Sequence, residues 1–251
     1  MRRFFIEEIK ERGNTCIISG AEAKHITRVL RMGRRDRFIL MDGKGARFQA
    51  VIDSAGRQEV LVTLEKPLPA PPHSPVDITL CQSLLKSRPM DFVIQKTSEL
   101  GVDHIFPFSS ERTVTRLDDN RSANRVRHWR EIARSATKQS DRVTPAEIVP
   151  LSSLMNLTGQ WKKKDALKVI LWEEEDSKDL KGLLRASSPA KHFIGIVGPE
   201  GGFSREEVEI VNEAGFISVS MGRRILRAET AAITMVAIVQ YEWGDLSLNE
   251  K

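Results

Sequence analysis

Residues 193–214, FIGIVGPEGGFSREEVEIVNEA, combine the features that decide the fold. A short apolar run, Phe193–Val197, is typical of a strand buried in a parallel sheet. A glycine-rich turn follows, and then a helix that Ser204 and Glu207 begin with a capping box and Gly215 ends. A strand that passes through a tight turn into a helix is the repeating unit of α/β folds.

The same alternation of strand and helix extends over residues 73–251. Apolar runs predict strands at 76–85, 102–108, 167–172, 193–197 and 217–221, and helical periodicity predicts helices at 89–100, 122–140, 204–214 and 228–243. The last helix is apolar on nearly every face, so we expect it to be buried on several sides, within the domain or between subunits. This part of the chain is therefore predicted to be α/β with a mainly parallel sheet.

A proline-rich connector precedes this α/β region. Five prolines lie between Pro67 and Pro75, and proline interrupts both helices and central strands. We therefore predict two domains, at 1–72 and 73–251.

The first domain has the signals of a small β-structure. Apolar runs at 38–41, 48–52 and 60–64 are separated by turns such as Asp42-Gly43, and one helix is expected at Ala21–Arg31. Strands at this spacing predict a small antiparallel β-barrel.

The composition is typical of a globular protein of the cytoplasm. The chain has 251 residues, 40% of them hydrophobic and 29% charged, and no apolar run long enough to span a membrane. Residues 1–8 lack the apolar segment of a signal peptide. Two cysteines, Cys16 and Cys81, form no CxxC pair, and no Cys or His cluster has metal-ligand spacing, so we expect a reducing compartment and no metal.

The net charge of +5 is concentrated in the first domain. Residues 1–72 hold 14 Lys and Arg against 9 Asp and Glu, whereas residues 73–251 hold 25 of each. A basic domain beside a neutral one indicates a polyanionic partner, although a well-solvated surface would give the same charge.

Two glycine-containing turns are candidate walls of a pocket. In open α/β sheets, ligands bind at the carboxyl ends of strands, and Gly198–Gly202 follows such an end. By itself this turn matches neither a G-x-G-x-x-G fingerprint nor a P-loop, and a tight structural connection explains it. A second turn, Met221–Thr230, places Arg227, Glu229 and Thr230 at the N-terminus of the last helix. Together the two turns predict one binding site.

These segments resemble the paired signatures of the SPOUT class of RNA methyltransferases. Gly-Pro-Glu-Gly-Gly-Phe-Ser at 198–204 and Met-Gly-Arg-Arg-Ile-Leu-Arg-Ala-Glu-Thr-Ala at 221–231 are similar to those of the RsmE family, which methylates N3 of a uridine in 16S ribosomal RNA. The resemblance includes residues 42–45, 99–102 and 139–142. Small departures at Met41, Met221 and Arg35 do not touch the polar groups of the predicted pocket.

The resemblance implies a fold, a cofactor and an assembly. The C-terminal domain would contain a deep trefoil knot, the N-terminal domain would be a PUA-like RNA-binding barrel, and the protein would be a homodimer. The cofactor would be S-adenosylmethionine. Carried over by motif, its binding residues are Leu171, Gly198, Glu200, Gly201, Met221, Gly222, Ile225, Leu226, Arg227 and Thr230.

The implied reaction assigns catalytic roles to Arg227 and Glu229. The protein has to align methyl donor and acceptor and to help remove the proton from N3 of uracil. Arg227 is our candidate for stabilising the anionic uracil. Glu229 or Glu200 would orient it or accept the proton, and this choice stays open.

The expected partner is 16S ribosomal RNA, within the small ribosomal subunit. The candidate RNA-binding residues are Arg3, His25, Arg28, Arg31, Arg112, Arg127, Gln139 and Arg142. His25, Arg28 and Arg31 are three residues apart, which predicts a shared helical face. The basic run 121–142, to which three of the others belong, would otherwise be a solvated helix face.

Two other functions compete with this one. The chain could be an enzyme of the same superfamily that acts on another site, such as a ribose 2′-hydroxyl of tRNA. It could also be a noncatalytic RNA-binding factor for ribosome assembly. The second signature argues against the latter, because such a factor needs no cofactor site.

Overall fold

The structure is a computed structural model that describes residues 1–6, 8–9, 13–115 and 118–246. The chain forms two compact units. One consists of Met1–Pro72 with Thr137–Pro145, and the other of His73–Ala136 with Ala146–Lys251. Nothing in the sequence indicates that the short segment Thr137–Pro145 groups with the first unit.

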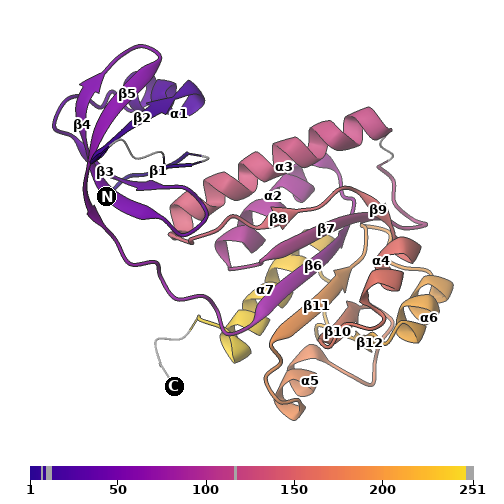
Figure 1. The fold of residues 1–251 in the computed structure, drawn as a ribbon. Helices are drawn as coiled ribbons and strands as arrows, with labels where there is room; N and C mark the ends of the chain where they lie inside the picture. Colours follow the sequence, from indigo (N-terminus) through magenta and orange to yellow (C-terminus); the bar gives the residue numbers. More distant parts are fainter. Residues whose placement is uncertain (7, 10–12, 116–117, 247–251) are drawn as a thin grey trace. The chain divides into compact units, whose positions relative to one another are not determined.

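The first unit is built on a five-stranded sheet (Figure 1). Its strands are β1 (Arg3–Phe5), β2 (Thr15–Ser19), β3 (Arg37–Met41), β4 (Arg47–Ala55) and β5 (Glu59–Pro67), in the order β1-β3-β4-β5-β2. The pairs β3–β4, β4–β5 and β2–β5 are antiparallel, as predicted, but β1 pairs with β3 in parallel. The sheet is therefore mixed rather than purely antiparallel.

The predicted helix Ala21–Arg31 is shorter and irregular. Helix α1 (Gly20–Lys24) passes directly into a π-helical turn, η1 (His25–Val29). Arg31 lies beyond this turn with a φ of +50°, so the prediction that it shares an α-helical face with His25 and Arg28 is wrong. The hydrogen bonds of a π-helix span five residues, which shifts side chains three apart away from a common face.

The second unit contains a seven-stranded sheet in which every recorded strand pair is parallel. Its strands are β6 (Asp77–Ser83), β7 (His104–Ser109), β8 (Glu147–Ile148), β9 (Ser152–Ser153), β10 (Leu167–Leu171), β11 (His192–Val197) and β12 (Ile217–Val219). They follow the order β12-β10-β11-β6-β7-β8, with β9 also paired to β7. The prediction of an α/β fold with a mainly parallel sheet is confirmed.

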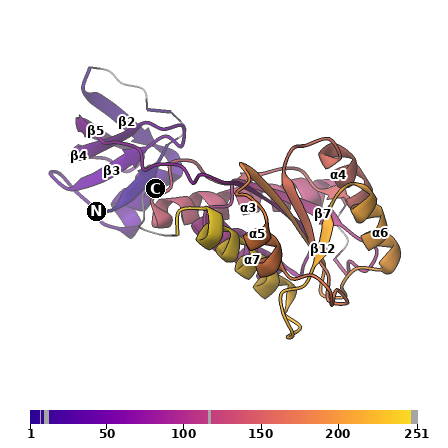
Figure 2. The same cartoon turned by 90° about the horizontal axis from the view of Figure 1, so that it is seen from below.

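Helices cover both faces of this sheet (Figures 1 and 2). One face packs against α2 (Ser87–Glu99), α3 (Asp119–Ser140), α5 (Leu180–Ala186) and α7 (Ala228–Trp243). The other packs against α4 (Leu154–Trp161) and α6 (Arg205–Glu213). Helix α7 contacts α2, α5, β6 and β11, which explains why it is apolar on nearly every face.

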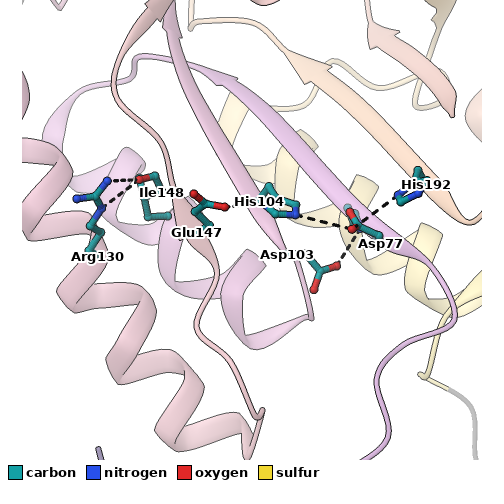
Figure 3. Close-up of polar contacts among 8 residues, drawn as sticks. Asp77, Asp103, His104, Arg130, Glu147, Ile148 and His192 are labelled. Atoms are coloured by element: carbon teal, nitrogen blue, oxygen red, sulfur yellow. Dashed lines mark hydrogen bonds and ion pairs between the residues drawn. The ribbon is translucent and has the colours of Figure 1, made fainter. Parts of the chain in front are cut away.

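A polar network joins the amino ends of the strands (Figure 3). Asp77 Oδ2 lies 3.7 Å from both His104 Nε2 and His192 Nδ1, and His104 Nδ1 lies 3.2 Å from Glu147 Oε2. Asp103 accepts a hydrogen bond of 3.0 Å from the Ile78 amide. Because the strands are parallel, these side chains gather at the edge of the sheet opposite to the strand carboxyl ends.

Two searches of the described residues bear on metal and membrane binding. Within those residues, no group of three or more His, Cys, Asp or Glu side chains is placed to hold a metal ion. None of the helices that they form is long and apolar enough to cross a membrane.

Candidate functional site

A cavity of about 550 Å³ lies at the carboxyl ends of β10, β11 and β12. Its walls come from residues 171–173 after β10, 197–200 and 202–203 after β11, and 220–229 with Ala231 between β12 and α7. Pro89 in the first turn of α2 completes the lining. The position follows from the parallel sheet, since the carboxyl ends of these strands share one edge.

The structure brings the two glycine-containing segments together in this cavity. Eight of the ten predicted cofactor residues line it, as do both predicted catalytic residues: Leu171, Gly198, Glu200, Met221, Gly222, Ile225, Leu226, Arg227 and Glu229. Gly201 and Thr230 do not. The Gly201 carbonyl instead accepts a hydrogen bond of 3.3 Å from Arg112 Nη1, and Thr230 is exposed in the first turn of α7.

Several lining residues were not among those predicted from the sequence. Trp172 and Glu173 extend the wall after β10, and Pro89 comes from a helix that precedes the other walls by about 80 residues. Glu173 could have been suspected from its place directly after a buried strand. Pro89 could not, because its role as a helix starter already explains it.

The turn after β11 needs its glycines. Gly202 has a φ of +68°, and a side chain there would collide with the Glu173 carboxylate. A Cβ on Gly198 would lie 3.0 Å from the Phe203 ring. The turn is therefore packed tightly against its own helix and against the wall after β10.

Glu207 ties this turn to the loop after β7. Its Oε2 accepts a hydrogen bond of 3.1 Å from the Ser204 amide, which completes the predicted capping box. Its Oε1 accepts one of 2.8 Å from the Glu111 amide. The side chain is largely buried, with a relative exposure of 8%. One carboxylate thus joins two loops as well as capping a helix.

The cavity carries charges of both signs. Its lining includes three carboxylates (Glu173, Glu200 and Glu229) and three guanidinium groups (Arg223, Arg224 and Arg227). Glu200 Oε1 accepts a hydrogen bond of 3.3 Å from the Lys86 amide. Arg227 is exposed at the N-cap of α7, and no residue in the described part of the chain pairs with its guanidinium. Such a site suits a ligand with both positive and negative groups.

The predicted RNA-binding residues are divided between the two units. The first unit contains Arg3, His25, Arg28, Arg31, Gln139 and Arg142, and the second contains Arg112 and Arg127. His25, Arg28, Arg31, Gln139, Arg112 and Arg127 are exposed, and Arg142 is half-buried. Arg3 instead forms an ion pair of 2.7 Å with Asp141.

Comparisons with known proteins match most of the chain. Residues 72–240 match the family described as RNA methyltransferase domain, and residues 18–65 match the RNA methyltransferase PUA domain. Ribosomal RNA small subunit methyltransferase E of Aquifex aeolicus is 32% identical over 95% of this chain and 99% of its own. The Bacillus subtilis enzyme of the same name is 28% identical over 96% and 97%.

Two solved structures are similar over nearly all of the chain. A methyltransferase from Legionella pneumophila, solved with bound S-adenosylmethionine, has a TM-score of 0.90 and 32% identity, with 97% of this chain and 98% of that chain covered. Ribosomal RNA small subunit methyltransferase E from Neisseria gonorrhoeae, also bound to S-adenosylmethionine, has a TM-score of 0.89 and 33% identity, with 98% and 100% covered.

Proposed function

Because the chain belongs to the ribosomal RNA small subunit methyltransferase E family of RNA methyltransferases, we propose that it methylates small-subunit ribosomal RNA with S-adenosylmethionine as methyl donor. The acceptor is N3 of a uridine in 16S ribosomal RNA. The observation that carries this proposal is that both signature segments line the same cavity.

The lining of the cavity fits this cofactor. The volume of about 550 Å³ lies within the range of roughly 300–1,000 Å³ that is usual for ligand sites. Leu171, Val197 and Leu226 offer apolar surface for an adenine ring. The three carboxylates suit its sulfonium and ammonium groups, and the arginines suit its carboxylate. The cofactor supplies an activated methyl group, so the protein needs no covalent nucleophile.

The protein's own part in the reaction is alignment and proton removal. The N3 proton of uracil has to leave before or during methyl transfer, and the resulting anion needs a positive partner. Arg227 suits this role because its guanidinium has no partner among the described residues. Glu229 is the better proton acceptor, since Glu200 already accepts a hydrogen bond from the Lys86 amide. N3 is accessible only in an unpaired or flipped uridine.

The finer features of the fold belong to the same proposal. Helix α7 packs on β6 and β11 in the middle of the sheet, although the preceding strand β12 lies at its edge beside β10. A chain that returns in this way has to cross the loops after β10 and β11, which supports a deep trefoil knot. The first unit would close into a PUA-like barrel.

We further propose a homodimer that acts in the cytoplasm on the small ribosomal subunit. Tyr241 on α7 is 69% exposed, and an exposed large aromatic side chain suits a subunit contact. The candidate RNA-binding residues predicted from the sequence would contact the ribosomal RNA. The exposed side chains of Arg28 and Arg127 have no partner among the residues described and suit phosphate contacts.

Two measurements test the function. Titration calorimetry with S-adenosylmethionine is expected to show binding to the purified protein, and absence of binding would refute the enzymatic function. Mass spectrometry of 16S ribosomal RNA from a strain without this protein is expected to show loss of one 3-methyluridine. If that nucleoside persisted, the acceptor assignment would be wrong.

A further inference from the structure

Gln82 is a fully buried polar residue directly behind the wall of the cavity. It lies near the end of β6, paired in register with Val197 of β11, and its relative exposure is 0%. Val197 and Gly198 line the cavity, but Gln82 itself does not. Its side chain is therefore separated from a ligand by the backbone that the ligand would touch.

The amide nitrogen of Gln82 holds that backbone. Nε2 donates to the carbonyls of Ser83 at 3.0 Å, Gly198 at 3.2 Å and Val197 at 3.5 Å. Its two N–H groups are thus shared among three carbonyls. Those of Val197 and Gly198 lie where β11 ends and the glycine turn begins, and that of Ser83 lies at the end of β6 itself. The reversed amide would place its oxygen against the same three carbonyls, so these contacts fix its orientation.

The other half of the amide is unpaired. Gln82 Oε1 is buried and has no hydrogen-bond partner within the described part of the chain. A buried polar atom without a partner destabilises the fold, and an apolar side chain of the same shape would avoid this cost. Residues that cost stability in this way are typical of functional regions. The hydrogen bonds of this side chain are therefore those that its Nε2 donates.

We infer that Gln82 is a positioning residue for methyl transfer, which sets the Val197–Gly198 backbone in the geometry that binds the cofactor. The inference rests on the proposed function only where it names the cofactor. The contacts by which Gln82 orders the turn after β11 are present without any cofactor. A change at Gln82 should therefore affect both cofactor affinity and the order of this turn.

Gln240 on α7 provides a matched control. It is also 0% exposed, and its Nε2 donates to the Gly101 carbonyl at 3.3 Å. Its Oε1 accepts from the Ser74 hydroxyl at 2.9 Å and from the Asp245 amide at 3.3 Å. None of these partners lines the cavity. Gln82→Met and Gln240→Met therefore remove equally buried amides, one beside the cavity wall and one away from it.

A first comparison needs no cofactor. Hydrogen exchange, followed by mass spectrometry, is measured on the cofactor-free full-length proteins. Gln82→Met is expected to speed exchange in residues 197–204, whereas Gln240→Met leaves exchange there as in the wild type. Unchanged exchange in Gln82→Met, or equal acceleration in both variants, would overturn the positioning role.

The second comparison measures cofactor binding and turnover. Gln82→Met is expected to raise the Kd for S-adenosylmethionine about tenfold, which corresponds to 1.4 kcal/mol, and Gln240→Met to leave it within about twofold. At saturating cofactor, kcat of Gln82→Met should lie closer to the wild-type value than the Kd for the cofactor does, because the reacting groups are unchanged. If the wild type binds but both variants bind equally well, the inference fails. If the wild type does not bind S-adenosylmethionine, the proposed function fails. The exchange experiment, which needs no cofactor, still tests whether Gln82 orders the turn.

Gln82→Glu adds a signature that a merely structural role would not give. A protonated carboxyl at this position can donate one O–H to the Gly198 carbonyl, whereas an ionised one faces three carbonyl oxygens. Burial favours the neutral form, and the ionised form gains weight as the pH rises. Affinity of this variant for the cofactor should therefore fall with rising pH relative to the wild type. A constant ratio would count against the inference.

Discussion

Arg227 stands where the cavity wall becomes the first turn of α7. If its guanidinium stabilises the anionic uracil, Arg227→Ala should lower kcat by about 100-fold, in the range that loss of one charge-stabilising donor costs. The Kd for S-adenosylmethionine should change less than about threefold. Single-turnover assays and calorimetry on the same protein measure the two quantities. Equal losses in both would make Arg227 a cofactor-binding residue only.

Glu207 does more than complete the capping box of α6, because it also accepts a hydrogen bond from the loop after β7. Glu207→Ala leaves the buried Ser204 amide and the Glu111 amide without their acceptor. Since an unpaired buried donor costs about 1–3 kcal/mol, the free energy of unfolding should fall by about 2 kcal/mol or more. Glu209 lies exposed on the same helix, and Glu209→Ala should change the free energy of unfolding by no more than about 0.5 kcal/mol. Urea unfolding curves test both variants. Similar losses of unfolding free energy in the two would contradict the proposal that Glu207 joins the two loops.

Individual elements differ in how far the sequence predicts them. Helix α6 was predicted within a residue at each end, because Ser204, Glu207 and Gly215 are local signals that act through neighbouring backbone groups. The stretch after Ala21 was predicted less well, because a π-turn replaces the regular helix from His25 to Val29. Ile26 in this turn and Met32 just after it are buried. The helical periodicity of apolar residues does not distinguish a π-turn from regular α-helix.

The candidate site shows the same division. Its two glycine-containing walls were predictable because their residues form recognisable motifs. Gln82 was not, because a glutamine within the apolar run of β6 looks like an interruption. Its importance depends on a carbonyl more than 100 residues later in the chain. Such pairings follow from sheet order, which the sequence pattern alone does not determine.

The packing of α7 on β11 can be tested at Gly195. A side chain there would collide with Met235, which is fully buried. Gly195→Ala should therefore lower the free energy of unfolding by about 1–3 kcal/mol through overpacking. Combined with Met235→Ala, which vacates that space, the loss should be smaller than the sum of the single losses. Strict additivity in thermal or urea unfolding would show that the two positions do not compete for room.

At the scale of the whole molecule, each unit contains one buried cysteine. Cys16 lies in the core of the first unit and Cys81 in that of the second. Burial raises the pKa of the Cys81 thiol far above its usual range, which keeps it protonated and unreactive in the folded state.

Alkylation of these thiols should therefore report the opening of each unit separately. Without urea, neither is expected to react with iodoacetamide. With increasing urea, Cys16 should react first, because the smaller unit buries less apolar surface. Peptide mass spectrometry assigns the label to each cysteine. Simultaneous labelling would show that the two units unfold as one.

The segment Thr137–Pro145 has a consequence for how the protein comes into being on the ribosome. Within the first unit, Arg47 is only 6% exposed, and its guanidinium contacts the Asp141 carboxylate at 2.6 Å. Asp141 is synthesised about 70 residues after the last strand of that unit, several seconds later at roughly 5–20 residues per second. Until then the Arg47 guanidinium lacks the carboxylate with which it pairs in the complete chain. The amino-terminal unit therefore emerges first but is completed late, and a nascent chain halted before residue 141 carries it in an unfinished state.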